Sequence, residues 1–231
     1  MMSSDFPERY NRSLYPTFYD SLLGLLREDI SILDVGSGRR PALDPVSRPS
    51  GCTYDGLDIS ASELEAAPEG SYDEVWISDL CISNPRLREK YDIVISWQVL
   101  EHVSSLYAAV DNVRAYLSPR GVFVAALSGS WGFFSVANRV IPHKIATAAM
   151  HHLLGRDPES VFPAHYDHCS FDGLRGAFAK WSSVTITPFY TGGNYLNFSP
   201  LIRKVYLTGE NFIERRNWRN LATHYLVVAQ K

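Results

Sequence analysis

The chain has 231 residues, of which 45% are hydrophobic and 20% charged, and its formal net charge is −3. These values fit one globular domain and exclude collagen-like, coiled-coil and disordered chains. Basic residues form no dense stripe, so we expect no nucleic-acid partner. We expect neither a secretory leader nor a membrane span, because no long apolar run occurs in the sequence. The three cysteines follow no metal or disulfide pattern, which indicates a cytoplasmic protein.

The first half of the chain alternates apolar runs with segments of helical periodicity, beginning with an amphipathic helix over residues 13–27. Continuous apolar runs are typical of parallel strands that are buried on both faces. The expected strands cover residues 30–35, 54–57, 75–77, 93–95 and 122–127, with a short helix from Ser60 and a longer one over 103–117. This order predicts an α/β fold with a doubly wound, mostly parallel sheet, whose ligands bind at the carboxyl ends of the strands.

Residues 128–160 interrupt the alternation, because they favour helix and contain no strand. We expect a helical insertion after the fifth strand that serves as a lid and binds the acceptor, within a single domain spanning residues 1–231. Its first aromatic residues, Trp131, Phe133 and Phe134, either line an apolar acceptor pocket, touch a lipid surface or pack beneath the lid.

The last third of the chain returns to the earlier pattern. The sequence predicts a helix over residues 174–181, a strand at 184–187, two short helices between Pro200 and Trp218, and a final strand at 224–228.

A glycine-containing loop follows the first strand, in the run from Asp34 through Gly36 and Ser37 to Gly38. Glycines there let a ligand approach the backbone closely. Such a loop fits a dinucleotide or an adenosyl-sulfonium cofactor. The dinucleotide fingerprint has a third glycine or alanine where this chain has Pro41, which disfavours a nicotinamide-dependent oxidoreductase.

Two acidic residues follow the next two strands. Asp58 ends the second strand 20 residues after Gly38, where a carboxylate accepts hydrogen bonds from both ribose hydroxyls. Asp79 and Leu80 follow the third strand, where we expect the acid to accept from an adenine amino group and the leucine to pack on the ring. The alternative for Asp79 is a cap on the following turn.

These motifs, in this order over residues 15–127, resemble those of the class I S-adenosylmethionine-dependent methyltransferases. The resemblance extends to the fourth motif, from Tyr91 to Val103, while Arg40 replaces the usual last glycine of the first loop. A narrower resemblance, from Pro158 to Leu174, is to bacterial members that tailor glycans, lipids and small molecules.

The resemblance implies a seven-stranded Rossmann-like sheet with an antiparallel last strand. It also implies S-adenosylmethionine as the cofactor and S-adenosylhomocysteine as its product. The cofactor-binding residues that it implies are Asp34, Gly36, Ser37, Gly38, Asp58, Ile59, Asp79, Leu80, Ser96 and Trp97.

A hydroxyl group holds its proton near neutral pH, so methyl transfer to it gains about 10²–10⁴-fold from a general base. We expect His102 to be that base, because it follows the fourth strand at what we take to be the opening of a helix. The alternative is a histidine that only packs or caps there. His165, with Tyr166 and His168 nearby, is the second candidate base.

We expect no metal. Some ubiquinone-pathway O-methyltransferases, which the chain resembles from Gln98 to His102, carry two acids and a histidine there that bind a divalent ion, but Gln98 replaces the first acid. A zinc site formed by His165, His168 and Cys169 would lack a fourth ligand.

The sequence therefore predicts an enzyme that transfers a methyl group to a hydroxyl of a small-molecule, sugar or lipid-linked acceptor, with peripheral membrane contact as an open question. A nicotinamide-dependent oxidoreductase and a methyltransferase-like binding module without catalysis are the alternatives.

Overall fold

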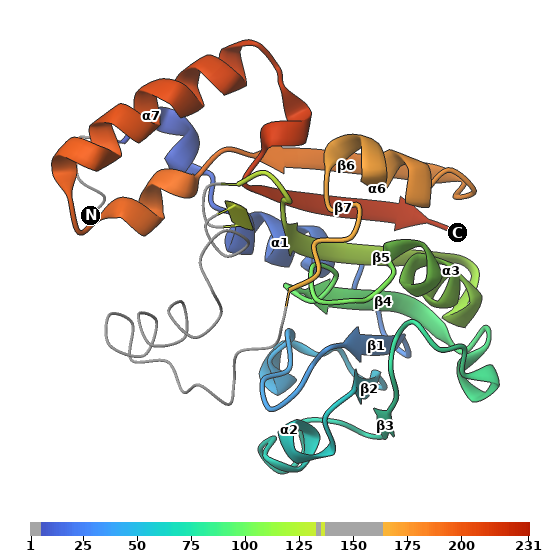
Figure 1. The fold of residues 1–231 in the computed structure, drawn as a ribbon. Coiled ribbons are helices and arrows are strands. Elements are labelled where there is room, and N and C mark those ends of the chain that lie inside the picture. Colours follow the sequence, from blue (N-terminus) through green and yellow to red (C-terminus); the bar gives the residue numbers. More distant parts are fainter. Residues whose placement is uncertain (1–5, 133–134, 137–163) are drawn as a thin grey trace.

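The computed structural model describes residues 6–132, 135–136 and 164–231, and these form a seven-stranded sheet with helices on both faces (Figure 1). The strand order is β3-β2-β1-β4-β5-β7-β6. The strands are β1 (Ser31–Val35), β2 (Thr53–Asp58), β3 (Val75–Ile77), β4 (Tyr91–Trp97), β5 (Leu117–Ser128), β6 (Ser183–Phe189) and β7 (His224–Gln230). β7 is antiparallel to both of its neighbours, while β1 to β5 are parallel. The predicted fold class, all seven strands and the antiparallel last strand are confirmed.

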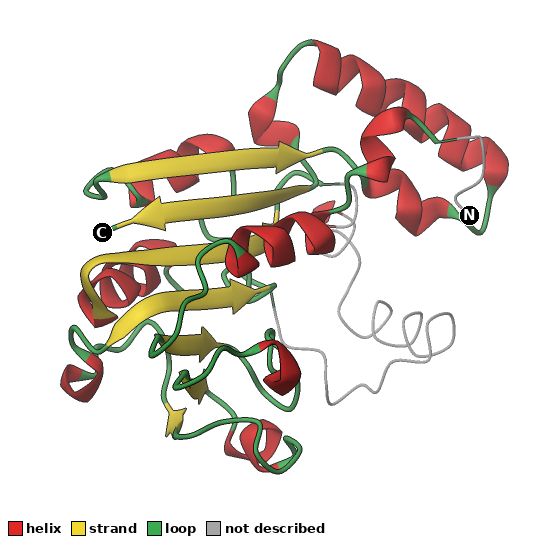
Figure 2. Ribbon diagram, turned by 180° about the vertical axis from the view of Figure 1, so that it is seen from behind, coloured by secondary structure: helices red, strands yellow, loops and turns green. Residues whose placement is uncertain are grey.

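Helices cover the two faces of the sheet because neighbouring residues of each buried strand point to opposite sides. Ile93 packs on one face with Phe18 of α1 (Leu14–Leu23). Val94 packs on the other face with residues of α3 (Leu106–Tyr116) and α6 (Phe171–Ala177). Figure 1 shows α3 and α6 in front of the sheet, and Figure 2, seen from behind, shows α1 on the opposite side.

Three predicted helices have different bounds in the structure. The helix expected over residues 103–117 begins at Leu106, because the Ser105 side chain caps it by accepting from the Ala108 N–H. The prediction that His102 opens this helix is therefore wrong, since His102 lies in the preceding loop. The helix expected over 13–27 ends at Leu23, and the one expected over 174–181 is α6, whose N-cap is Ser170.

The two short helices expected between Pro200 and Trp218 are one helix, α7 (Pro200–Arg215). Ser199 caps its start and Pro200 occupies the first turn. Gly209 lies inside it facing open space, and an interior glycine costs only about 1 kcal/mol, which does not break a helix of this length.

Two further expectations concern the helical insertion and the absence of a membrane span. Of the insertion expected over 128–160, residues 133–134 and 137–160 lie outside the described residues. Among the helices that the structure does describe, none has the length and apolar character to cross a membrane.

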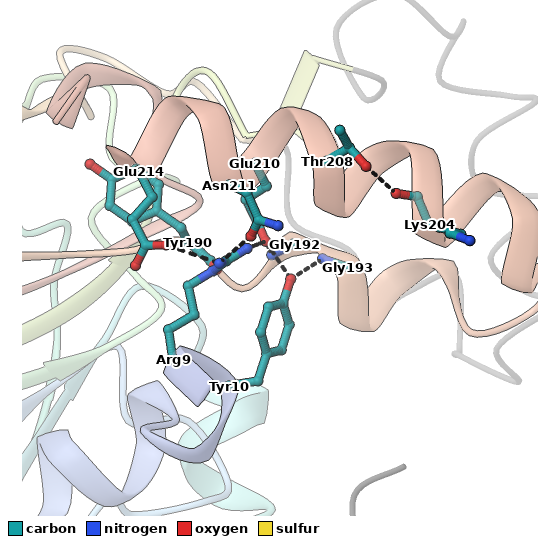
Figure 3. A network of polar contacts seen from close by, with 10 residues as sticks. All are labelled: Arg9, Tyr10, Tyr190, Gly192, Gly193, Lys204, Thr208, Glu210, Asn211 and Glu214. Carbon is teal, nitrogen blue, oxygen red and sulfur yellow. Dashed lines mark hydrogen bonds and ion pairs between the residues drawn. The ribbon is translucent and has the colours of Figure 1, made fainter. Parts of the chain in front are cut away.

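A network of polar contacts joins the N-terminal turn η1 (Glu8–Asn11) to α7 (Figure 3). The Arg9 guanidinium donates to the carboxylates of Glu210 at 2.8 Å and Glu214 at 2.9 Å. The Tyr10 hydroxyl donates to the same Glu210 oxygen, and the other Glu210 oxygen accepts from the Gly192 N–H at 2.8 Å. Glu210 is buried, so this network fixes α7 to the segment that follows β6.

We expect Arg9→Gln to lower the free energy of unfolding by about 3 kcal/mol, because it removes the cation that faces a buried carboxylate. The matched control is Arg27→Gln, since Arg27 pairs with Asp92 but its side chain is 62% exposed, and its loss should cost less than about 1 kcal/mol. Urea denaturation of both variants measures the difference. Equal losses would contradict the structural importance of the network.

Candidate functional site

The ends of β1 and β4 meet at the carboxyl edge of the sheet, and the loops that follow them touch. Gly36 has a φ of 67°, and its N–H donates to the Leu57 carbonyl at 2.7 Å. A Cβ added at Gly36 would lie 2.2 Å from the Val99 side chain. The first position of the glycine loop therefore admits no side chain, because Val99 packs directly against its backbone.

Asp34 supports the glycine loop from inside the protein. Its Oδ2 accepts from the Ala42 N–H at 2.7 Å and from the Tyr54 hydroxyl at 2.6 Å, and the side chain is buried. Burial raises the pKa of Asp34 to about 7. These contacts hold the loop in place, so Asp34 is placed to act on the cofactor through the loop.

Asp58 joins the end of β2 to the same loop. Its Oδ2 accepts from the Gly38 N–H at 3.0 Å and its Oδ1 accepts from the Ser60 N–H at 2.8 Å. Burial raises the pKa of the Asp58 carboxyl. Each carboxylate oxygen accepts more than one hydrogen bond, so Asp58 retains the capacity to bind two hydroxyls. The sequence placed Gly38 and Asp58 at one site, and the structure brings them into contact.

Asp79 and Leu80, which we expected at the adenine, and Ile59, expected only as a cofactor-binding residue, have different surroundings. Asp79 Oδ1 accepts from the Cys81 N–H at 2.8 Å, which is the capping contact weighed as its alternative role. Leu80 is 5% exposed and belongs to a hydrophobic core cluster, whereas Ile59 is 60% exposed at the end of β2. Of these apolar side chains, Ile59 offers the larger open surface to a flat ring.

Ser96 and Trp97 end β4. The Ser96 hydroxyl is buried, and it has no hydrogen-bond partner among the residues that the structure describes. Trp97 packs against α1, with its ring centroid 5.0 Å from those of Tyr15 and Phe18. Trp97 thus fixes α1 beside the site, and Ser96 leaves a polar atom there.

A buried polar cluster follows Trp97, formed by Gln98, Glu101 and Ser128. The Ser128 hydroxyl donates to Gln98 Oε1 at 2.8 Å, and the Ser128 N–H donates to Glu101 Oε1 at 3.2 Å. Gln98 Nε2 and Glu101 Oε2 are buried without a partner in the described part of the chain. Burial raises the pKa of Glu101, and the charge of the adjacent His102 opposes that rise. Ser128 was not among the expected site residues, although its place at the end of the fifth strand was a signal for it.

The two candidate bases lie at the same edge. The Glu101 carbonyl accepts from the N–H groups of His165 and Tyr166, both at 2.9 Å, so the segment after the insertion is anchored next to His102. His102 is partly buried and His165 is exposed. Sequence reasoning could not show this proximity, because the two histidines are separated by the whole insertion.

A third histidine, His224, begins β7 and pairs with Ser128 across the sheet. Its Nε2 lies 3.2 Å from the Tyr195 hydroxyl. Burial lowers the pKa of His224 to about 4, so it is neutral at physiological pH. Sequence reasoning missed it, although an antiparallel last strand must begin at the edge where the parallel strands end.

The residues fit S-adenosylmethionine. Asp58 places a carboxylate beside the Gly38 N–H, and the buried Ser96 hydroxyl has no hydrogen-bond partner in the part of the chain that the structure describes. Within the described ranges, no cluster of three His, Cys, Asp or Glu side chains is arranged to hold a metal. The Cys169 thiol of the zinc hypothesis is buried, while His165 and His168 are exposed.

Asp34→Asn tests the loop support through pH. The carboxyl titrates at about 7 in the folded protein and near 3.8 when unfolded, so the folded state binds more protons between these values and stability falls as pH rises through that window. The amide introduced by the substitution does not titrate in this range. Its carbonyl oxygen can accept the same two hydrogen bonds, from the Ala42 N–H and the Tyr54 hydroxyl, that Asp34 Oδ2 accepts. Urea denaturation across this pH range should show a shallower loss of stability in the variant. Identical slopes would contradict the assignment.

Asp58→Ala is expected to weaken S-adenosylhomocysteine binding by more than about ten-fold, because a hydrogen bond to a charged group contributes about 1.5–3 kcal/mol. Asp79→Ala removes the matched carboxylate from the next strand end and should cost less, since an adenine amino group can turn to water. Isothermal titration of the folded variants measures both affinities. A larger loss in Asp79→Ala would mean that the ribose and adenine positions are misassigned.

Comparison with known proteins agrees with this geometry. A family model described as a methyltransferase domain matches residues 8–178. The ubiquinone biosynthesis O-methyltransferase of Rhodopseudomonas palustris (strain TIE-1) is 30% identical over 114 residues, which are 48% of this chain and 45% of the relative. That of Bradyrhizobium diazoefficiens is 32% identical over 134 residues, 56% of this chain and 49% of the relative. The chain thus spans about half the length of these curated relatives.

Solved structures share the fold. A SAM-dependent methyltransferase from Archaeoglobus fulgidus superposes with a TM-score of 0.58 at 18% identity, covering 97% of this chain and 95% of that one. Phosphoethanolamine N-methyltransferase 2 of Haemonchus contortus, in complex with S-adenosyl-L-methionine, gives 0.57 at 13% identity, covering 99% and 54%.

These findings confirm the expected resemblance and the expected cofactor, S-adenosylmethionine. They argue against the alternative of a nicotinamide-dependent oxidoreductase. The family model alone covers most of the chain. The protein belongs to the methyltransferase-domain family, with the fold of the class I S-adenosylmethionine-dependent methyltransferases.

Proposed function

We propose that the protein transfers the methyl group of S-adenosylmethionine to a hydroxyl group of a small-molecule, sugar or lipid-linked acceptor. The observation that carries this proposal is the pair of histidines at the carboxyl edge, where the Glu101 carbonyl anchors the backbone of His165 beside His102. A base at that place is what hydroxyl methylation requires. The O-methyltransferase names of the curated relatives support the choice of a hydroxyl acceptor.

The proposed division of roles follows the positions of the side chains. Asp58 and the backbone from Gly36 to Gly38 hold the donor, whose sulfonium supplies an electrophilic methyl group when it is bound. His102 accepts the proton of the acceptor hydroxyl as the oxygen attacks. The Glu101 carboxyl lies next to it in the sequence, in a buried site. His165 is the second candidate for the base.

Positioning accounts for a large share of the expected rate. An in-line displacement needs the acceptor oxygen about 3–3.5 Å from the methyl carbon, and fixing that geometry lowers the barrier by about 7–11 kcal/mol. Glu101 and Ser128 tie the loop after β4 to the end of β5. This rigid frame is what we propose holds the base toward the acceptor.

The acceptor itself is proposed only as a class. Trp131, in the described part of the insertion, is 55% exposed near the end of β5 and is available to an apolar portion of the acceptor. Phe133 and Phe134, expected to share this role, lie outside the described residues. Mass spectrometry of extracts incubated with a labelled methyl donor would identify the acceptor. Binding of S-adenosylhomocysteine without any methylated product would instead support a binding module that lacks catalysis.

We expect His102→Ala to lower turnover by about 10²–10⁴-fold and to leave S-adenosylhomocysteine affinity within about three-fold. The physical reason is that the histidine acts on the acceptor hydroxyl, whereas the glycine loop and Asp58 hold the donor. His168→Ala is the matched control, because His168 is exposed on the segment that also carries His165. Turnover is followed as release of S-adenosylhomocysteine.

Three other outcomes would change the roles. Full turnover of His102→Ala would make His102 structural and would move the test to His165. Loss of cofactor affinity in the same variant would place His102 at the donor site. Equal losses in His102→Ala and His168→Ala would contradict a specific base at either position.

A further inference from the structure

The helix α7 turns its acidic side toward the protein and exposes several apolar side chains on the opposite side. The acidic residues of the helix, Glu210 and Glu214, both contact Arg9 of the N-terminal turn, and Figure 3 shows Arg9 and Tyr10 pointing to that side of the helix. Leu207 lies three residues before Glu210 and is buried with it. Surface helices of globular proteins normally bury an apolar stripe. In α7, Leu207 and Ile213 pack inward, but Leu201, Val205 and Phe212 remain exposed on the opposite side.

The outward side carries an apolar stripe, which we define as Leu201, Val205 and Phe212, and the exposed Ile202 lies beside it. With 3.6 residues per turn, Leu201, Val205 and Phe212 project within about 40° of one another, roughly opposite Glu210 and Glu214. Leu201 is 74% exposed and Val205 is 69% exposed. Single exposed apolar residues need no explanation, but three of them aligned on one side of a helix form a candidate interaction surface.

Cations border the apolar stripe, and acids do not. Lys204, Arg215 and Arg216 are exposed, and the Arg216 guanidinium lies 5.2 Å from the Phe212 ring centroid. The acidic side chains of α7 are both on the inner side, paired with Arg9. The outer side of α7 therefore combines apolar side chains with positively charged ones.

We propose that the apolar stripe of α7 docks on the surface of a bilayer that contains anionic lipids. Apolar side chains with flanking Lys and Arg are the chemistry by which a helix lies in the plane of such an interface. A second copy of this chain fits less well, because two such stripes brought together would oppose their cations without facing acids.

Docking through α7 would also orient the proposed active site. α7 follows β6, whose last residue Phe189 pairs with His224 at the edge where β5 ends. Figures 1 and 2 both show α7 projecting beyond that edge of the sheet. The inference goes beyond the proposed methyl transfer and does not depend on it, because vesicle binding is measured without an acceptor.

The test is cosedimentation of the full chain with vesicles of phosphatidylcholine containing phosphatidylglycerol, compared with pure phosphatidylcholine. We expect binding to the anionic vesicles that Val205→Glu weakens by about ten-fold or more. The matched control is Val46→Glu, since Val46 is 91% exposed on a different part of the surface, and it should bind as the unchanged protein does. Binding should fall as NaCl rises from about 0.1 M toward 1 M, which shortens the Debye length from about 10 Å to about 3 Å.

Circular dichroism and S-adenosylhomocysteine affinity establish that both variants are folded, and Val205 and Val46 lie outside the proposed site. The proposal is overturned if the unchanged protein does not bind anionic vesicles, or if Val205→Glu and Val46→Glu bind equally. It is also overturned if analytical ultracentrifugation shows a dimer that Val205→Glu dissociates, because a second copy would then cover the stripe. None of these results bears on methyl transfer, which is measured separately with acceptor.

Discussion

The contact between Gly36 and Val99 is the constraint on which the rest of the site depends. In the strand order, β1 lies between β2 and β4, so the chain reverses its direction of winding there, and in such sheets ligands bind outside the carboxyl ends of these strands. Because a Cβ at Gly36 would collide with Val99, the two loops approach as closely as backbone permits. Both sides of the site are thereby fixed relative to each other: on one side the glycine loop, which we propose binds the donor, and on the other the loop that carries Glu101 and His102.

Buried carboxylates bind the backbone on both sides of the site. Asp34 and Asp58 bind backbone N–H groups of the glycine loop and its neighbours, and Glu101 binds the backbone of Ser128. Burial raises the pKa of all three, so the structure keeps ionisable groups in a poorly solvated place. Such groups are costly unless they are hydrogen-bonded, and those that retain unpaired atoms are the ones positioned to meet a ligand.

At the far end of the sheet, the same edge continues into α7 through the segment after β6. The Arg9 network fixes the inner, acidic side of that helix, which leaves the apolar stripe facing outward. One buried ion pair therefore has two consequences. It ties the N-terminal turn to the C-terminal helix, and it determines which side of α7 is available to a partner.

The strands and their parallel arrangement could be predicted from the amino-acid sequence, because apolar runs and glycine turns are local patterns. The spacing of Gly38 and Asp58, together with the resemblance, placed both at one site, and the structure brings them into contact. Only the tertiary structure decided the rest. In the structure, His102 lies in a loop and not in a helix, and the two expected short helices form the single helix α7. His165, Ser128 and His224 lie at the carboxyl edge of the sheet. Those contacts join residues far apart in the chain, and burial, backbone hydrogen bonding and the orientation of a helix have no local signature.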